Sequence, residues 1–381
     1  MSQVRLLHII EHMNDQAIEN WLMRIMGDAR IRYPHYHWTF YSTLGKPGRL
    51  DDKVRELGGE VLYSPVPLTN TRKFISALHN TIERGRYDII HAHHDIVSAV
   101  YLLASSRTRI KRRVVHVHNT TMDLPTPSKV KKAMVWEPMR RICLTMSDRI
   151  AGISRDALAS MIRDSVPKAS RDVVVYYGID TSKFRNPRRT PAETRSMIDV
   201  PASAKMILFA GRMTPLKNPR FVVDVLAQIS AQYPDAIAVF AGVGDEQDRV
   251  KQAAADIGVE SRIRVLGWRN DLPELMLSAD LLLWPGDESV KEGLGLGIVE
   301  AQAAGLPIIM SRAVPDDAVV IQSLVSVVPL ATGAEAWGRE AVRMLSSGHI
   351  SRSDALAAIE ASHFSLAAGT DNVMKLYEGV S

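Results

Sequence analysis

The chain has 381 residues, of which 46% are hydrophobic and 23% charged. This is the composition of a soluble globular protein of about two domains, and it excludes disordered and fibrous classes. A single cysteine, Cys143, excludes an intramolecular disulfide and fits a reducing compartment. The opening stretch MSQVRLLHIIEHMND becomes polar too soon for a signal peptide, and no apolar run is long enough to predict a transmembrane helix. We therefore expect a cytoplasmic protein.

Charge is distributed unevenly along the chain. Residues 1–185 hold 29 Lys and Arg against 18 Asp and Glu, whereas the remainder holds 18 against 24. In the basic half, KVKKAMVWEPMRR (129–141) mixes basic and apolar residues at roughly helical spacing. It could lie on an anionic membrane or hold an anionic acceptor, and a solvated basic face explains it equally well. Nucleic acid is disfavoured as a partner, because no aromatic-rich basic motif accompanies the charge.

In the first half of the chain, strand-like runs alternate with segments of helical periodicity. Such alternation predicts a parallel sheet with helices on both faces. The expected strands are residues 4–10, 37–41, 60–63, 88–93, 113–118, 149–154 and 173–178.

A polar, proline-containing stretch at 180–191 is predicted to be a linker, and the alternation then restarts. The expected strands are residues 205–211, 236–242, 262–267, 280–285 and 306–311. We expect an α/β protein with two doubly wound domains facing a central cleft, spanning 1–184 and 185–363. The final helix, 364–381, would complete the first domain. Ligands of such sheets bind beyond the carboxyl ends of the strands.

AGRMTPLKNP (210–219) directly follows the first strand of the second domain. Arg212 and Lys217 would lie in the loop at the carboxyl end of that strand, where two cations near a helix start suit a diphosphate. The alternative is a pair of surface cations at a turn.

EGLGLGIVE (292–300) follows a later strand of the same domain. The helix is predicted to begin near residue 297 or 298, which places Glu300 in its first turn. Glycines before the helix would let a ligand reach backbone amides, and Glu292 and Glu300 could each accept hydrogen bonds from hydroxyl groups. A sugar nucleotide offers both a phosphate and two sets of hydroxyls. Alternatively, Glu300 is a helix-start residue and Glu292 a solvated loop residue.

The glycines also suggest a dinucleotide fold, whose fingerprint is G-x-G-x-x-G. Counting from Gly293 the third glycine position is Ile298, and counting from Gly242 it is Gln247. Both matches fail, so a nicotinamide-dependent dehydrogenase is disfavoured.

Several motifs in fixed order resemble the donor-binding half of the family 4 retaining glycosyltransferases. They are GRMTPLKN, AGVGDEQ, VLGWRNDLPELMLSADLLLWP and EGLGLGIVEAQAAGLPIIMS. VVYYGIDTSKF (174–184) resembles the end of that family's first domain, and DIIHAHH and VVHVHNT resemble strands of it. The resemblance covers nearly the whole chain, and EAQAAGLP is similar to the subgroup that makes exopolysaccharide or capsule.

The resemblance implies the GT-B fold and a role for each matching residue. Arg212 and Lys217 would grip the donor diphosphate, Glu292 would lie near the donor sugar, and Glu300 would accept from the ribose. His118 would face the donor sugar from the other domain. The further residues implied in donor binding are Gly211, Gly244, Trp268, Arg269, Gly293, Leu294, Gly295 and Leu296.

The implied reaction retains the anomeric configuration and needs no cofactor, and the absence of a D-x-D triplet agrees with a metal-independent route. We favour a UDP-sugar over GDP-mannose as donor, and a glycan or lipid-linked acceptor at the inner membrane face. One alternative is a GT-B sugar-nucleotide epimerase or hydrolase. Another is a non-catalytic subunit of glycan assembly.

Two departures from the family pattern concern loops. The family usually carries a glycine pair after the first strand, where MNDQAIEN (13–20) has Gln16 and Ala17. The acceptor-side loop Asn14, Asp15 and Gln16 would therefore present a side chain where backbone normally approaches. In addition, WPGDESVKEG (284–293) is longer than the usual connection to the glutamate, which predicts a reshaped sugar pocket.

Five histidines raise the question of a metal, since neighbouring strand ends could bring several together: His91, His93, His94, His116 and His118. Side chains alternate between faces along a strand, and no cysteine or H-E-x-x-H motif supports a metal site. We therefore predict no metal, with His118 as the functional histidine and Asp95 placed to orient one imidazole.

Overall fold

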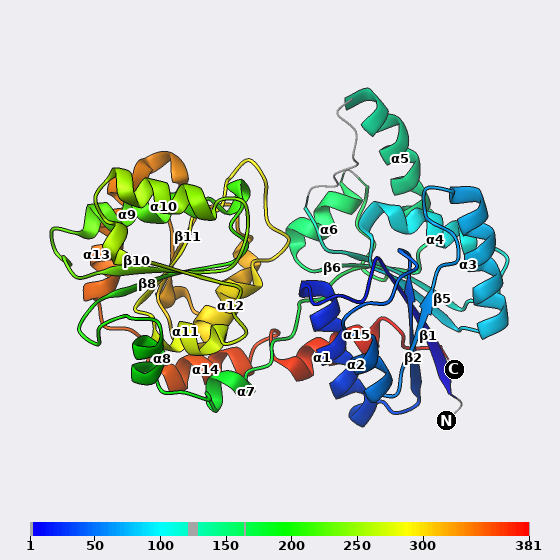
Figure 1. Cartoon of the computed structure of the whole chain (residues 1–381). Coiled ribbons are helices and arrows are strands. Elements are labelled where there is room, and N and C mark those ends of the chain that lie inside the picture. Colours follow the sequence, from blue (N-terminus) through cyan, green and yellow to red (C-terminus); the bar gives the residue numbers. More distant parts are fainter. Residues whose placement is uncertain (1–2, 121–128, 164, 381) are drawn as a thin grey trace. The chain divides into compact units, whose positions relative to one another are not determined.

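The computed structural model describes residues 3–120, 129–163 and 165–380. The chain divides into two compact units (Figure 1), Met1–Ile179 with Leu366–Ser381, and Asp180–Ser365. The sequence predicts the first boundary after residue 184, whereas in the structure the first unit ends at Ile179. The physical reason is that the short helix α7 (Ser182–Arg185) belongs to the second unit, where Thr181 and Arg185 both bond the carboxylate of Glu360.

The first unit contains a parallel sheet with strand order β3-β2-β1-β4-β5-β6-β7. Its strands are β1 (Val4–Ile10), β2 (Tyr36–Ser42), β3 (Glu60–Tyr63), β4 (Ile89–Ala92), β5 (Arg112–Val117), β6 (Arg149–Gly152) and β7 (Asp172–Val174). Its helices are α1 (Ala17–Arg32), α2 (Asp51–Glu56), α3 (Thr71–Gly85), α4 (Ser98–Ala104), α5 (Lys129–Met146), α6 (Arg155–Ile162) and α15 (Leu366–Lys375), with a 3-10 turn η1 (Asp95–Val97).

Helices cover both faces of this sheet, as the alternating pattern predicts. On one face, α3 and α4 bury Phe74, Leu78 and Tyr101 against Leu7 and Ile90 of the central strands. On the other face, Trp21 of α1 and Tyr377, just after α15, contact a row of strand histidines. The C-terminal helix thus completes the first unit.

The second unit contains a parallel sheet with order β10-β9-β8-β11-β12-β13. Its strands are β8 (Met206–Ala210), β9 (Ile237–Ala241), β10 (Ile263–Gly267), β11 (Leu281–Trp284), β12 (Ile308–Met310) and β13 (Val325–Val327). Its helices, besides α7, are α8 (Pro191–Met197), α9 (Arg220–Ile229), α10 (Gln247–Asp256), α11 (Leu272–Ser278), α12 (Leu296–Ala303), α13 (Gly333–Ser346) and α14 (Arg352–Glu360). The 3-10 turns are η2 (Pro215–Lys217), η3 (Glu260–Arg262), η4 (Asp316–Ala318), η5 (Gln322–Leu324) and η6 (Leu330–Thr332).

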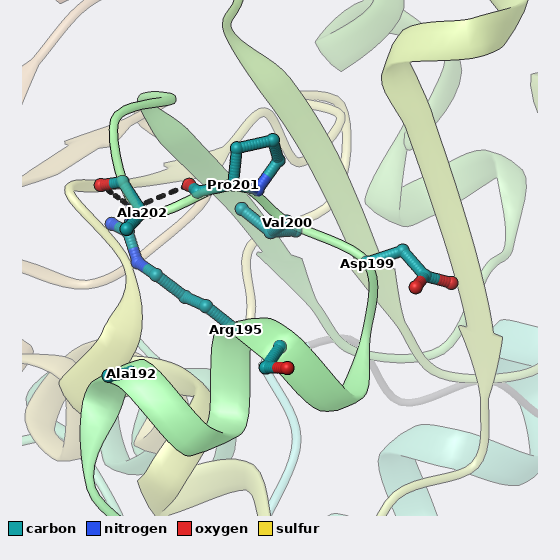
Figure 2. A pocket seen from close by; sticks show the side chains of 7 residues that line it. Ala192, Arg195, Asp199, Val200, Pro201 and Ala202 are labelled. Atoms are coloured by element: carbon teal, nitrogen blue, oxygen red, sulfur yellow. Dashed lines mark hydrogen bonds between the residues drawn. The ribbon is translucent and has the colours of Figure 1, made fainter.

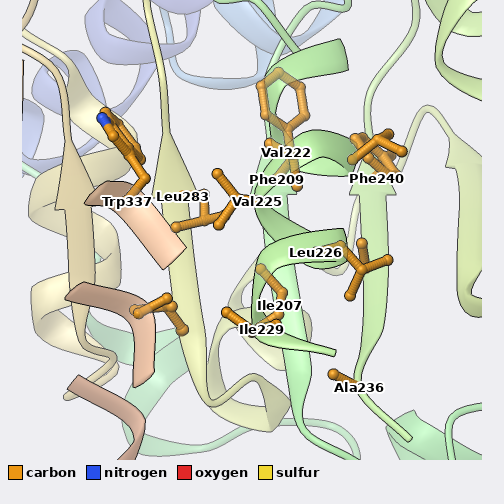
Figure 3. Close-up of a cluster of buried hydrophobic side chains, with 14 of the residues drawn as sticks. Ile207, Phe209, Val222, Val225, Leu226, Ile229, Ala236, Phe240, Leu283 and Trp337 are labelled. Carbon is orange, nitrogen blue, oxygen red and sulfur yellow. The ribbon is translucent and has the colours of Figure 1, made fainter. Parts of the chain in front are cut away.

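The main core of this unit lies between the sheet and helices α9, α10 and α13. Val225 and Leu226 of α9 and Trp337 of α13 pack on Phe209 and Leu283 of the strands (Figure 3). Strands β8 and β9 are buried along their whole length, which is why each reads as an uninterrupted apolar run.

Two elements differ from the sequence-based expectation. The predicted linker at 180–191 contains α7 and the start of α8, where Thr190 and Glu193 form a capping box. Strand β13 was not expected, because three residues in a loop-rich stretch carry too little pattern. Within the described residues, no helix is both long and apolar enough to cross a membrane.

Candidate functional site

The second unit has a point where strand order reverses. From β8 the chain first adds β9 and β10 on one side of the sheet, and it then crosses to add β11, β12 and β13 on the other side of β8. In parallel α/β sheets, ligands bind at this point, beyond the carboxyl ends of the strands. Three segments meet there: 211–219 after β8, 242–246 after β9 and 285–295 after β11.

The loops after β8 and β9 are joined by backbone hydrogen bonds. The Gly211 amide donates to the Ala241 carbonyl at 3.0 Å, and the Met213 amide donates to the Val243 carbonyl at 2.9 Å. A Cβ at Gly244 would lie 2.2 Å from the Met213 carbonyl oxygen, and φ there is +155°. Glycine is therefore needed at 244 for the loops to approach each other, a reason separate from any contact with a ligand.

A lysine, a glutamate and a tryptophan form a compact group at this edge. Lys217 Nζ lies 2.6 Å from Glu292 Oε2, and Trp284 Nε1 donates to Glu292 Oε1 at 2.6 Å. The Lys217 ammonium also lies 4.8 Å from the centroid of the Trp284 ring. Both charged side chains are largely shielded, with 21% and 13% of their surface exposed. Water therefore weakens this ion pair less than it would weaken a surface pair.

The long connection from β11 to Glu292 is tied down along its length. Ser311 Oγ donates to the Gly286 carbonyl at 2.6 Å, and the Glu292 amide donates to the Ala313 carbonyl at 2.7 Å. Glu288 Oε1 accepts from the backbone amides of Arg312 and Leu330. The longer loop thus forms a fixed wall beside Glu292.

Helix α12 begins at Leu296, earlier than expected, because Gly295 takes the left-handed conformation at φ +80° and serves as the N-cap. Glu300 therefore lies beyond the first turn, which corrects the expected position. It is half-buried. The first amides of a helix have no intrahelical acceptor, so the start of α12 offers donors to an anion. Gly293 lies between this helix start and Glu292, and the side chain of Leu294 is buried.

Arg212 and Trp268 are exposed at the same edge of the sheet. Trp268, after β10, has 63% of its surface exposed. Within the residues that the structure describes, no hydrogen bond or ion pair involves the side chain of Arg212, although its backbone carbonyl accepts from the Thr214 amide at 3.0 Å. Both side chains are therefore available to a ligand.

Arg269 is held by an acidic partner. Its Nε donates to Asp271 Oδ1 at 2.7 Å and its Nη2 to Oδ2 at 2.5 Å, and Arg189 bonds the same carboxylate. Burial alone would raise the pKa of Asp271, but the hydrogen bonds and charge of Arg269 lower it. Arg269 thus shapes the loop, and Trp268 is the freer of the two expected base contacts.

A pocket of about 420 Å³ beside α8 lies elsewhere in this unit (Figure 2). Arg195 crosses it and donates to the carbonyls of Pro201, Ala202 and Ala204 and to Asp280. The lining residues precede β8, so the pocket is at the amino ends of the strands, away from the switch point. The bonds of Arg195 make it a structural brace.

In the first unit, the loop after β1 is held by the loop after β2. The His12 ring bonds the Pro47 carbonyl, and Asn14 Nδ2 bonds His12 Nδ1 at 2.7 Å. Asp15 accepts from Asn20, while Gln16 is exposed and precedes α1 without a side-chain capping bond. An exposed Gln16 side chain thus stands where the family usually has glycine.

Five buried histidines form a hydrogen-bonded ladder on one face of this sheet. His8, His91, His93, His116 and His118 come from β1 and the ends of β4 and β5. Residues two apart on a strand share a face, which is why the pairs 91/93 and 116/118 point the same way. His8 Nδ1 bonds His93 Nε2 at 3.0 Å, and His93 Nδ1 bonds His118 Nε2 at 3.1 Å.

The hydrogen bonds of the ladder form two chains, His8–His93–His118 and His91–His116, each with a tyrosine at one end. The Tyr177 hydroxyl lies 2.5 Å from His118 Nδ1, and the Tyr377 hydroxyl lies 2.6 Å from His91 Nδ1. His91 Nε2 also bonds His116 Nδ1 at 3.1 Å. A neutral imidazole has one donor and one acceptor, so these bonds suit uncharged rings. Burial lowers the pKa of His8 and of His116 to about 3 and lowers those of the others well below the usual value.

His118 and Asp95 are placed differently from the expectation. Both ring nitrogens of His118 are engaged, with Tyr177 and His93. The Asp95 carboxylate accepts from the His118 backbone amide at 2.6 Å and from Asn119 at 2.7 Å. Asp95 therefore orients the chain after β5 and not an imidazole.

Two histidine triads, 8/91/93 and 93/116/118, bring ring nitrogens within 4.8 Å of one another. A metal ion could bridge such a spacing. Hydrogen bonds already join the rings 8/93, 91/116 and 93/118, whereas His8 Nε2 and His116 Nε2 are buried without a hydrogen-bond partner among the described residues. That this protein needs no metal stays a prediction.

Comparison with known proteins identifies the family. Residues 34–183 match the model of glycosyltransferase family 4, and residues 192–348 match that of glycosyl transferases group 1. The chain belongs to glycosyltransferase family 4. Each of the two matches falls within one of the two units, apart from the residues around their boundary.

Two related proteins show how far this glycosyltransferase resembles known members. EpsF of Bacillus subtilis (strain 168), named as a glycosyltransferase, is 26% identical over 356 residues, covering 92% of this chain and 90% of that protein. The UDP-Gal:alpha-D-GlcNAc-diphosphoundecaprenol alpha-1,3-galactosyltransferase of Escherichia coli is 26% identical over 267 residues, covering 69% and 67%.

Solved structures show the fold of the glycosyltransferase. HepE of Anabaena, solved in complex with UDP, superposes with a TM-score of 0.77 at 19% identity, covering 98% of this chain and 99% of that one. With the two doubly wound units, this shows the expected GT-B fold.

The predicted donor residues of this glycosyltransferase cluster at the switch point, where Lys217 and Glu292 touch. Sequence reasoning missed Trp284, which bonds Glu292. The signal was a tryptophan at the very end of an otherwise aliphatic strand, LLLW.

Proposed function

We propose that this protein is a retaining, metal-independent glycosyltransferase that moves a sugar from a UDP-sugar to a glycan or lipid-linked acceptor. The product would belong to exopolysaccharide, capsule or cell-envelope biosynthesis. The observation that carries the proposal is the Lys217–Glu292 pair at the switch point of the second unit, with the exposed Arg212 in the same loop as Lys217. A cationic edge next to a helix start suits a diphosphate, and a neighbouring carboxylate suits sugar hydroxyls.

In the proposed reaction, the bond between the sugar and the diphosphate breaks and negative charge grows on the departing phosphate. Arg212, Lys217 and the first amides of α12 stabilise that charge. The acceptor hydroxyl forms the new bond on the face that the phosphate leaves, and its proton passes to a phosphate oxygen. No protein nucleophile is needed for this retention. Glu292 accepts from Lys217 and Trp284 and has lone pairs left for a sugar hydroxyl.

Other donor contacts follow from exposure and position. Trp268 offers a face for the base, with Arg269 bracing its loop, and Glu300 accepts from the ribose. Backbone at Gly211, Gly293, Gly295 and Leu296 lines the phosphate path. A UDP donor is supported by HepE, solved with UDP and with UDP-glucose, and by the UDP-Gal named for the Escherichia coli relative.

His118 can contact the donor sugar only if one of its present hydrogen bonds breaks. Its ring nitrogens are both bonded inside the first unit, so one must leave Tyr177 or His93 before the ring can meet a sugar hydroxyl. The loop Asn14, Asp15 and Gln16 is assigned to the acceptor side, where the exposed Gln16 would select the acceptor.

The basic first unit is proposed to lie peripherally on an anionic membrane that carries the acceptor. Helix α5 projects from that unit (Figure 1), and its Met134 and Val135 are exposed. A diphospholipid acceptor is named for the Escherichia coli relative. Flotation with vesicles of anionic lipid, but not with neutral vesicles, is the expected result, and equal flotation with both would oppose the membrane role.

A donor panel tests the proposed function. UDP-glucose, UDP-galactose, UDP-N-acetylglucosamine and GDP-mannose would each be scored by thermal shift and by donor consumption, with EDTA present throughout. A bound donor stabilises the fold by roughly 2.7 kcal/mol at a hundred times its Kd. We expect a UDP-sugar to do so and GDP-mannose not to. Consumption without any acceptor, giving a free sugar or an epimer, would favour the epimerase or hydrolase; binding without turnover would favour a non-catalytic subunit.

Replacing Glu300 is expected to weaken nucleotide binding. Glu300→Ala removes a charged acceptor for ribose hydroxyls, and such hydrogen bonds contribute about 1.5–3 kcal/mol each. The Kd for UDP, measured by titration calorimetry, should rise roughly tenfold to a hundredfold. Glu300→Gln keeps one acceptor and should lose less. An unchanged Kd in Glu300→Ala would remove Glu300 from the ribose site.

A further inference from the structure

Trp284 is a buried aromatic residue that contacts both Lys217 and Glu292 of the proposed donor site. It ends β11, has 7% of its surface exposed, and its carbonyl accepts from the Ser311 amide at 3.1 Å. A Cβ placed on Gly297 would lie 2.8 Å from the Trp284 ring, so the first turn of α12 rests directly on the indole. The ring therefore has little freedom to rotate.

The indole fixes the carboxylate of Glu292 through one oxygen. Its Nε1 donates to Oε1 at 2.6 Å, which leaves Oε2 to pair with Lys217 at 2.6 Å. A Cβ on Gly286 would lie 3.3 Å from the same Oε1, so the carboxylate is also confined from the side of the β11 loop. An indole N–H can only donate, so Oε1 of Glu292 is the acceptor in this bond.

The same ring also holds the lysine. Lys217 Nζ lies 4.8 Å from the ring centroid, within the range of a cation–π contact. Trp284 thus positions the Lys217 ammonium in two ways. Its ring contacts the ammonium directly, and its N–H holds the Glu292 carboxylate that pairs with the ammonium.

We propose that Trp284 is a positioning residue for the transferase reaction: it orients Glu292 and through it holds Lys217 where the donor diphosphate departs. This inference rests on the proposed function. It adds the residue that keeps the Lys217 ammonium in position. The contribution belongs to the transition state, because the charge that Lys217 meets develops as the bond breaks. UDP also gains ribose and base contacts from Glu300 and Trp268 in the proposed site, so we expect UDP binding to depend less on the indole than the transition state does.

The test is Trp284→Phe, which keeps an aromatic ring on α12 and removes the N–H. We expect kcat for the UDP-sugar to fall tenfold or more, while the Kd for UDP stays within twofold. The matched control is Trp337→Phe, at a fully buried tryptophan of the same unit whose N–H bonds the Pro329 carbonyl at 3.4 Å. That control should lose melting temperature to a similar degree and keep its kcat. An unchanged kcat in Trp284→Phe would overturn the proposal, as would a joint loss of kcat, UDP binding and melting temperature.

A second measurement keeps this inference separate from the proposed function. In protein labelled with ¹⁵N-tryptophan, the Trp284 indole resonance is assigned by its loss in Trp284→Phe. Glu292→Gln should shift that resonance, because the indole loses its charged acceptor. Glu335→Gln, at an exposed glutamate of α13 in the same unit, should leave it in place. No shift in Glu292→Gln overturns the positioning role. Wild-type protein that consumes no nucleotide sugar, with the shift present, overturns the proposed function instead.

Discussion

Replacing Arg212 with alanine is expected to lower kcat by about two to three orders of magnitude, the usual effect of losing one preorganised donor to a developing negative charge. The Arg212 side chain is exposed and no described residue bonds it, so truncating it breaks no hydrogen bond or ion pair within the described residues. The melting temperature should therefore stay within a degree or so of the wild-type value. Steady-state kinetics with a saturating UDP-sugar measures the effect.

The matched control is Arg220→Ala, at an exposed cation that begins α9 close by in the chain. It should keep wild-type kcat, and Arg212→Lys should recover part of the loss because a point charge remains without the bidentate fork. If Arg212→Ala turned over at the wild-type rate, the diphosphate would have to bind elsewhere.

Lowering the pH from 7.5 to 5 is expected to open the first unit while the second unit stays folded. Burial depresses the pKa of each ladder histidine in the folded state, so the unfolded chain binds more protons below about pH 6.5. Stability is unaffected above that pH and is lost progressively as the pH falls towards about 3. At pH 5, each ring then lowers the free energy of unfolding by about 2 kcal/mol, which sums to roughly 10 kcal/mol for the five rings. This is comparable with the whole stability of a domain.

Hydrogen exchange by mass spectrometry, corrected for the intrinsic pH dependence, measures this separately for each unit. Peptides from β1, β4 and β5 should lose protection at pH 5, while peptides from β8, β9 and β11 keep it. The second unit is an internal control, because its histidines His349 and His363 lie outside the ladder. Equal loss in both sheets would show that the ladder does not govern acid stability.

Much of the fold follows from local pattern. The aliphatic runs of β1, β8 and β9 could be assigned from sequence because buried parallel strands are apolar along their whole length. β13, with three residues, and α7, with four, are too short for a periodic signal, and they depend on contacts with the rest of their unit. The start of α12 was misplaced because the left-handed Gly295 cap is a backbone feature that spacing does not reveal.

The sequence predicts which residues form the candidate site, but it does not predict which of their side chains touch. Arg212, Lys217 and Glu292 follow strand ends that topology brings together. The Lys217–Glu292 pair depends on how the β11 loop is anchored by Glu288 and Ser311, far along the chain from Lys217. Gly244 was assigned to ligand access, whereas the Met213 carbonyl already requires a glycine there. Alternation along a strand argues against a histidine cluster, but the pairs 91/93 and 116/118 each share a face. His8 joins them, whereas His94 bonds Tyr101 instead.

The most direct test of the account is ³¹P NMR of wild-type protein with a UDP-sugar, EDTA and membrane lipid extract as acceptor source. The account predicts that the UDP-sugar signals decay to those of UDP, that the sugar appears in a lipid-linked product with its anomeric configuration kept, and that Arg212→Ala stops this decay. Unchanged UDP-sugar signals across the donor panel, or release that requires added divalent metal, would contradict it.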